Sequence, residues 1–334
     1  MLTLPPEQSA PDVWTVGRII DWTTQHLKKH GSDTPRLDTE ILLAQARGCP
    51  RIQLYVDYSV PLTEAERTTM RDLVRRRAQH EPVAYLVGHR EFFGLDFRVT
   101  SDVLIPRPET ETLVLEVITA ARKRRDDGEP ASANDTATHS PDEPAADAKS
   151  NDAQAQADRS PIKVLELGTG SGCIAVSCAV HIPDAVVTAV DISPAALAVA
   201  RGNAATHRAG ERIRFLEGDL FAPLPDPERF DVIVSNPPYV AEGEMDSLPP
   251  DVRLHEPHLA LRAGPEGLDV VSRLVAQAAK WLNPGGLLLI EISPEQADAV
   301  VAMLAGQPEF DPASVLKDST GRLRVVRARL KVSE

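Results

Sequence analysis

The feature that most constrains the fold is an alternation of short apolar segments and helical segments in the second half of the chain. The apolar segments lie at 162–167, 186–190, 213–216 and 230–235. Runs of this length, rich in Val, Ile and Leu, predict strands buried on both faces, as in parallel sheets covered by helices. Helical stretches such as 173–181 supply the crossovers between them. We therefore predict an α/β domain with a Rossmann-like parallel sheet.

A glycine-rich turn joins the first strand to its helix. Gly168-Thr169-Gly170-Ser171-Gly172 follows the strand directly. Glycine lets backbone N–H groups approach a ligand closely, and a strand, a glycine turn and a helix form half of a nucleotide-binding unit. The spacing is G-x-G-x-G, whereas dehydrogenases use G-x-G-x-x-G, so the glycines alone are weak evidence.

Acidic residues end or follow the next two strands. Asp191 ends the second and can accept hydrogen bonds from both hydroxyls of a ribose. The alternative is that Asp191 caps the helix that begins near Pro194, although Ser193 fits that role better. Asp219 and Leu220 follow the third strand. They could flank an adenine, with Asp219 accepting from its amino group; otherwise Asp219 is a solvated loop acid.

The fourth strand runs into Asn236-Pro237-Pro238-Tyr239. The two prolines end the strand in a rigid turn at the carboxyl edge of the sheet, where open α/β sheets bind ligands. This turn offers the Asn236 side-chain carbonyl and the Pro237 backbone carbonyl to an –NH2 group, with Tyr239 as a stacking face. The alternative is a merely stiff loop. Beside a nucleoside site, the turn predicts methyl transfer to nitrogen from S-adenosylmethionine.

The chain resembles the peptide chain release factor glutamine N5-methyltransferases (the HemK, or PrmC, type) over nearly its whole length outside 126–160. The resemblance rests on GLDFRV (94–99), LIPRPETE (104–111), ELGTGSG (166–172), VSNPPY (234–239), EPHLAL (256–261) and GLD (267–269). LIPRPETE is the most specific to the family. The resemblance implies a seven-stranded class I S-adenosylmethionine-dependent methyltransferase fold.

The resemblance also implies the reaction and the roles of the motifs. The glutamine of a Gly-Gly-Gln segment in a release factor would be methylated, which modulates translation termination and leaves S-adenosylhomocysteine. Gly168–Gly172 and Asp191 would hold the donor, and Asn236 would touch both donor and substrate. Asn236–Tyr239, including Pro238, would hold the glutamine amide. Two departures stand out: Glu291-Ile292-Ser293 replaces the family's common EIG, and Leu220 stands where some members carry Trp.

A different region precedes the sheet. Helical periodicity at 13–31, 36–48 and 63–81 predicts a small N-terminal helical domain over 1–85, which we expect to recognise the substrate. In the first helix Val16, Ile19, Ile20, Thr23 and Leu27 share one face, and Thr63 begins a capping box.

Two further segments complete the predicted domains. A β-hairpin linker spans 86–105, and the methyltransferase domain spans 106–334. The stretch 126–160 carries nine acids against two basic residues and has no Val, Leu, Ile or aromatic residue. Because it cannot bury a core, we predict that it is disordered.

Charge and cysteine content narrow the class of protein. The net charge of −13 disfavours a general nucleic-acid binder. Cys49, Cys173 and Cys178 have no metal-like spacing, so we expect reduced thiols, no bound metal and a cytoplasmic protein. No apolar run reaches membrane-spanning length. We expect a monomer whose partner is the release factor.

Two other functions remain open. A nucleic-acid methyltransferase acting on adenine N6 or guanine N2 would use the same acceptor pair, but usually needs a basic recognition surface. A non-catalytic factor would not need an intact turn and glycine loop. Arg75-Arg76-Arg77 is either a solvated face or a contact for an acidic protein or ribosomal RNA, and Arg107 is either an ion-pair partner or a substrate contact.

Overall fold

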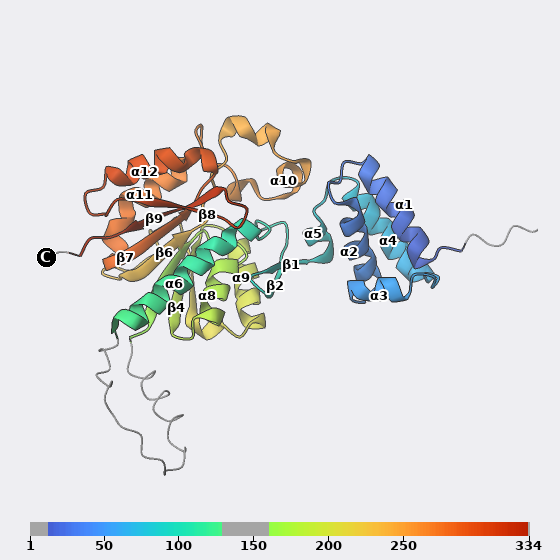
Figure 1. Ribbon diagram of the computed structural model, residues 1–334, viewed down its shortest axis with the longest axis horizontal. Coiled ribbons are helices and arrows are strands. Elements are labelled where there is room, and N and C mark those ends of the chain that lie inside the picture. Colours follow the sequence, from blue (N-terminus) through green and yellow to red (C-terminus); the bar gives the residue numbers. More distant parts are fainter. Residues whose placement is uncertain (1–12, 129–159, 333–334) are drawn as a thin grey trace, which may run out of the picture. The chain divides into compact units, whose positions relative to one another are not determined.

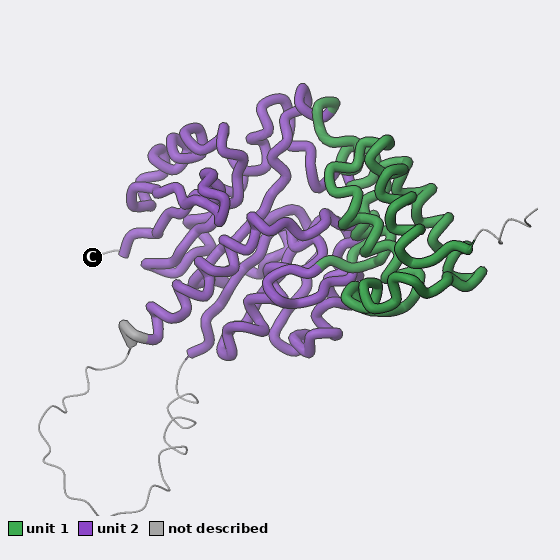
Figure 2. The backbone as a smooth tube through the Cα atoms, turned by 45° about the vertical axis from the view of Figure 1, so that its right-hand side comes forward, with its two compact units in different colours: residues 1–90, 99–101, 246–256 green, residues 91–98, 102–245, 257–334 purple. Residues whose placement is uncertain are grey.

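The computed structural model describes residues 13–128 and 160–332, which form two compact units (Figure 2). Of the described residues, unit 1 comprises 13–90, 99–101 and 246–256. Unit 2 contains the rest. The segment 246–256, which follows the NPPY turn in the sequence, clusters with the helices of unit 1. Most of the segment predicted to be disordered, 129–159, lies outside the described residues.

Unit 1 is a bundle built on the predicted helices. They are α1 (Val16–Lys29), α2 (Pro35–Arg47) and α4 (Glu64–Arg77), joined by the short α3 (Arg51–Val56), α5 (Val83–Val87) and α10 (Pro250–His255) (Figure 1). The predicted apolar face of α1 is buried, and Thr63 and Glu66 form the predicted capping box. The short helices were not predicted, because five or six residues are too few to show a helical period.

The arginines at the end of α4 have separate partners. Arg77 lies 2.8 Å from Asp38 of α2, and both side chains are nearly buried. Arg76 pairs with Glu81. Arg75 is 70% exposed and pairs with Asp72. The three arginines therefore form neither one solvated face nor one contact patch, because the nearly buried Arg77 links α4 to α2.

Unit 2 contains a seven-stranded sheet in the order β5-β4-β3-β6-β7-β9-β8. Its first five strands pair in parallel, and β9 and β8 complete it in antiparallel register. The strands are β3 (Ile162–Leu167), β4 (Ala185–Asp191), β5 (Ile213–Glu217), β6 (Phe230–Ser235), β7 (Leu282–Glu291), β8 (Ser314–Lys317) and β9 (Leu323–Arg329). The expected seven-stranded sheet is confirmed.

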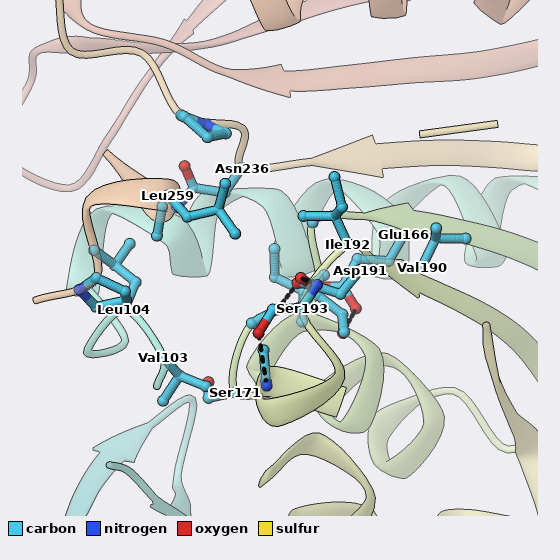
Figure 3. Close-up of a pocket in the computed structure, with 18 of the residues that line it drawn as sticks. Val103, Leu104, Glu166, Ser171, Val190, Asp191, Ile192, Ser193, Asn236 and Leu259 are labelled. Carbon is cyan, nitrogen blue, oxygen red and sulfur yellow. Dashed lines mark hydrogen bonds between the residues drawn. The ribbon is translucent and has the colours of Figure 1, made fainter. Parts of the chain in front are cut away.

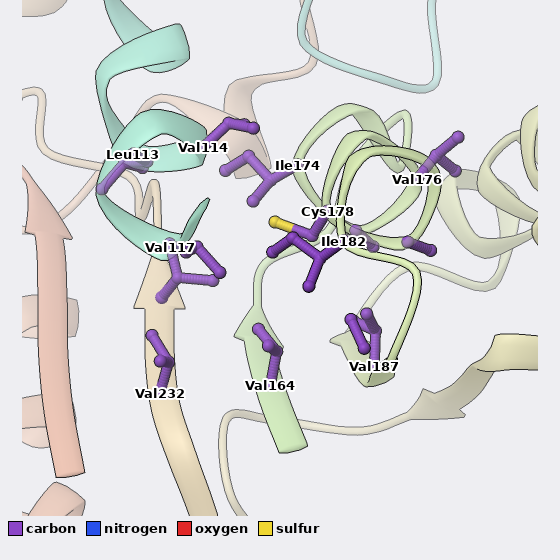
Figure 4. Close-up of a cluster of buried hydrophobic side chains, with 14 of the residues drawn as sticks. Leu113, Val114, Val117, Val164, Ile174, Val176, Cys178, Ile182, Val187 and Val232 are labelled. Atoms are coloured by element: carbon purple, nitrogen blue, oxygen red, sulfur yellow. The ribbon is translucent and has the colours of Figure 1, made fainter. Parts of the chain in front are cut away.

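Helices cover both faces of this sheet. On one face α6 (Glu111–Gly128) and α8 (Cys173–His181) pack over Val164, Val187 and Val232, as Figure 4 shows. On the other, α11 (Asp269–Trp281) and α12 (Ala297–Ala305) pack over alternate residues of the same strands. The near-continuous apolar strands follow from burial on both sides.

The Asn-Pro-Gly-Gly sequence at 283–286 is typical of a turn, but no strand ends there. Residues 283–286 lie within β7, where the register against β6 shifts between Phe230 and Val232. The Gly286 α-carbon has no room for a side chain, since a Cβ there would lie 2.7 Å from the Asn283 carbonyl oxygen. The Pro-Gly-Gly sequence therefore makes an irregularity in a strand rather than ending it.

A two-stranded hairpin precedes the sheet, formed by β1 (His89–Phe92) and β2 (Leu95–Arg98). Asn203, in α9 (Pro194–Thr206), accepts from the Arg98 backbone N–H at 2.9 Å and donates to its carbonyl at 3.0 Å. It also donates to the Ser171 carbonyl at 2.8 Å, so it ties the hairpin to the glycine turn. None of the described helices combines the length and apolarity that crossing a membrane requires.

Candidate functional site

A cavity of about 300 Å³ opens at the carboxyl ends of β3, β4, β5 and β6 in unit 2. Of the predicted site residues, it is lined by Gly168, Thr169, Gly170, Ser171, Asp191, Asp219, Leu220, Asn236 and Pro238. Figure 3 shows Asn236 lying beside Leu259, with Asp191 and Ser193 on the strand edge across the cavity. Gly172, Pro237 and Tyr239 are not among the lining residues.

The glycine turn wraps around a buried carboxylate. Glu166, at the end of β3, accepts from the Thr169 hydroxyl at 2.6 Å and from the Ala175 backbone N–H at 3.1 Å. Desolvation raises the pKa of Glu166 to about 8. Its second oxygen is buried and has no hydrogen-bond partner among the described residues. Gly172, at a φ of +80°, lets α8 begin close to Ala200, whose Cβ would lie 3.0 Å from an added Cβ.

Asp191 is held by the backbone. Its carboxylate accepts from the Gly170 N–H at 2.8 Å and the Ser193 N–H at 2.9 Å. Desolvation is the largest cause of its raised pKa. Ser193 caps α9 by accepting from the Ala196 N–H at 3.2 Å. The alternative role of Asp191 as that cap is therefore wrong, and its remaining lone pairs are available at the cavity wall.

Asp219 and Leu220 also line the cavity, and Leu220 has a φ of +49°. Arg273 of α11 places a guanidinium nitrogen 2.5 Å from the Asp219 carboxylate, in a pair whose side chains are both about half exposed. Arg273 itself lines the cavity. This partner was not predicted, because the two residues lie 54 positions apart in the sequence.

The NPPY turn is fixed from two sides. Asn236 donates from Nδ2 to the Thr110 hydroxyl at 3.1 Å, which leaves its Oδ1 as the free acceptor. Behind the turn, the Gln296 amide donates to the carbonyls of Tyr239 and Gly267, each at 2.9 Å. Desolvation raises the pKa of Tyr239 to about 12, so its hydroxyl remains protonated at neutral pH.

The LIPRPETE segment meets the same turn. Its Leu104, Pro106, Arg107 and Thr110 line the cavity. Arg107 therefore lies at the cavity wall. Thr110 is buried and also hydrogen-bonds the Glu291 carboxylate at the end of β7. Of these positions, Arg107 was singled out from the sequence, but Leu104, Pro106 and Thr110 were missed, because nothing in the sequence indicates which residues of the segment face the turn.

The two departures from the family pattern have local explanations. Ser293 caps a short 3-10 turn, Pro294–Gln296, and forms a capping box with Gln296. A serine there therefore stabilises the element that positions Gln296 behind the NPPY turn. Leu220 occupies the cavity wall without an aromatic face. Exposed Ile192, directly after Asp191, is a further apolar lining residue that sequence reasoning missed.

The cysteines are free thiols in the structure. Cys178 is buried in the core. Cys173 lines the cavity, but desolvation raises the pKa of its thiol to about 12. A thiol that stays protonated at neutral pH is a poor nucleophile.

Known protein families match both units. Residues 18–88 match the PrmC N-terminal domain, and residues 153–248 match the methyltransferase small domain. The release factor glutamine methyltransferase of Rhodopirellula baltica is 41% identical over 96% of this chain and 98% of its own. That of Geobacter sulfurreducens is 40% identical with the same coverage.

Among solved structures, the hMettl16 catalytic domain in complex with a MAT2A 3′UTR hairpin is similar with a TM-score of 0.51. It is 14% identical, and the match covers 77% of this chain and 82% of that chain. At that identity the likeness concerns the fold alone.

Proposed function

The chain belongs to the release factor glutamine methyltransferases, and from that membership we propose that it transfers a methyl group from S-adenosylmethionine to the side-chain amide nitrogen of a release factor glutamine. The observation that carries the proposal is the hydrogen bond from Asn236 Nδ2 to Thr110. It orients the amide so that Oδ1 is left to accept from an –NH2 group at the cavity. An acceptor at this position can bind an N–H of the substrate amide and so orient the nitrogen that is methylated.

The residues at the cavity fit the donor. Asp191 ends β4, where its carboxylate can accept from ribose hydroxyls. The glycine turn brings backbone close to the ligand space, and the unpaired oxygen of Glu166, whose carboxyl has a pKa raised to about 8, adds a buried polar group there. Asp219 and Leu220 would flank the adenine. Carboxylates also suit the positive charge of a sulfonium donor. When bound, this donor supplies an electrophilic methyl group.

The turn supplies orientation rather than a base. An amide nitrogen is a poor nucleophile because its lone pair is delocalised into the carbonyl. Acceptors at Asn236 Oδ1 and the Pro237 carbonyl would hold the –NH2 protons, favour a more pyramidal nitrogen and aim its lone pair. Tyr239 would provide packing, since its hydroxyl does not titrate near neutral pH. The proton can leave to water once methylation has made the nitrogen acidic.

The helical unit would recognise the protein substrate. A groove of about 620 Å³ lies between α1 and α4, with Ile19, Met70 and Val74 among its apolar lining. Arg67 and Arg71 are among the arginines at its edge, and no acidic residue of the described chain lines it. An acidic surface on the release factor with an apolar anchor would complement this groove.

The test is a methyl-transfer assay with labelled donor on release factor, total RNA and DNA in parallel. We expect label on the release factor alone, at the glutamine of its Gly-Gly-Gln segment by peptide mass mapping. Label on nucleic acid but not on release factor would instead support the amino-methyltransferase of bases. Absence of transfer to all three, with donor bound, would support a non-catalytic factor.

A further inference from the structure

A chain of three polar groups runs from the NPPY turn to the end of β7, and two of them, Thr110 and Glu291, are buried. Asn236 Nδ2 donates to Thr110 Oγ1 at 3.1 Å. Thr110, which is 2% exposed, hydrogen-bonds in turn to Glu291, which is 1% exposed. The three residues come from separate parts of unit 2, at positions 110, 236 and 291. One Glu291 oxygen, Oε2, is buried without a hydrogen-bond partner among the described residues, so this network is satisfied only in part.

The direction of each hydrogen bond between these three residues fixes the orientation of the Asn236 amide. An ionised carboxylate can only accept, so the single Thr110 proton points to Glu291. The Thr110 oxygen then offers only lone pairs to Asn236. Rotating the amide by half a turn would set its carbonyl oxygen against that oxygen with no proton between them. The –NH2 therefore stays on Thr110 and the carbonyl stays free.

We propose that Thr110 and Glu291 are positioning residues that hold the Asn236 amide in the one orientation able to accept from the substrate –NH2. This inference rests on the proposed methylation of a side-chain amide. It gives a chemical reason for the threonine of LIPRPETE and the glutamate of Glu291-Ile292-Ser293. Both act through Asn236 and neither needs to touch the substrate.

The charge of Glu291 gives the proposal a pH signature. Desolvation raises the pKa of Glu291 to about 7. Below that pH the protonated carboxyl can donate to Thr110, which frees the Thr110 proton to meet the Asn236 carbonyl and stabilise the reversed amide. Turnover should therefore rise as the pH rises through about 7. The charged or titratable groups acting on Glu291 are Arg324, Glu109, Arg107, Tyr239 and Cys173.

The first test separates positioning from folding. Thr110→Val keeps the side-chain shape and removes the hydroxyl, and should lower kcat for release factor about 10- to 100-fold. The affinity for S-adenosylmethionine and the melting temperature should stay near wild type. Thr110→Ser, which keeps the hydroxyl, should recover most of the rate. Wild-type kcat in Thr110→Val, or equal losses in both variants, would overturn the proposal.

The second test uses single-turnover rates at saturating donor between about pH 5.5 and about pH 8.5. Wild type should show the rise through about pH 7, and Glu291→Gln should lack it. Glu166, whose pKa is also raised, is present in both proteins and so cancels in the comparison. The same rise in Glu291→Gln would refute the role of Glu291. No transfer by wild type at any pH would instead count against the proposed function.

Discussion

Replacing Gly267 by alanine tests how the NPPY turn is supported. Gly267 has a φ of +72°, and a Cβ there would lie 2.4 Å from the Tyr239 carbonyl oxygen and 2.8 Å from the Gln296 amide nitrogen. Ordinary contact begins near 3.4 Å, so the turn would have to move by about 1 Å. A displacement of that size at a reacting group costs about 10²-fold in rate. We expect turnover to fall by that order.

Stability should fall as well. A non-glycine residue at positive φ costs about 1–2 kcal/mol, and crowding a packed site adds about 1–3 kcal/mol. Gly321→Ala is the matched control, because its φ is +85° but nothing lies within 4 Å of an added Cβ. Urea unfolding and labelled methyl transfer on both variants separate the two effects. If Gly267→Ala matches Gly321→Ala in stability and turnover, the claim that Gly267 supports the turn is wrong.

Other perturbations address the remaining residues. Asn236→Ala should keep the fold and lower kcat about 10²–10³-fold by removing one transition-state hydrogen bond; near-wild-type turnover would refute the amide clamp. Asp191→Ala should weaken donor binding in calorimetry while release factor binding persists; unchanged donor affinity would exclude the ribose role. Replacing 126–160 by a short Gly/Ser linker should leave turnover and melting temperature nearly unchanged, because loop length costs only about 0.6 kcal/mol per doubling; a large loss of activity on intact release factor would show that the segment takes part in recognition. Arg71→Glu should raise KM for intact release factor about tenfold and leave KM for a short Gly-Gly-Gln peptide unchanged. Its control is Lys28→Glu, on the exposed surface of α1 outside the groove. Equal effects of the two variants would count against recognition at the groove.

The sequence by itself determined the elements of the sheet and the order of the motifs. The strands of 162–167 and 230–235 were predicted to the residue, because burial on both faces leaves short segments that are mostly apolar. The glycine turn and Asp191 were placed at the cavity for a related reason. Parallel strands bring their carboxyl ends, and whatever follows them, to one edge of the sheet.

Tertiary structure alone decided which polar groups meet. Thr110 and Asn236 are 126 positions apart, Arg77 and Asp38 are 39 apart, and no local pattern marks either pair. Periodicity reports which face of an element is buried, whereas a hydrogen bond also requires two elements to dock within about 3 Å and a particular rotamer. That is why the sequence could name Asn236 but could not say which groups hold its amide in place.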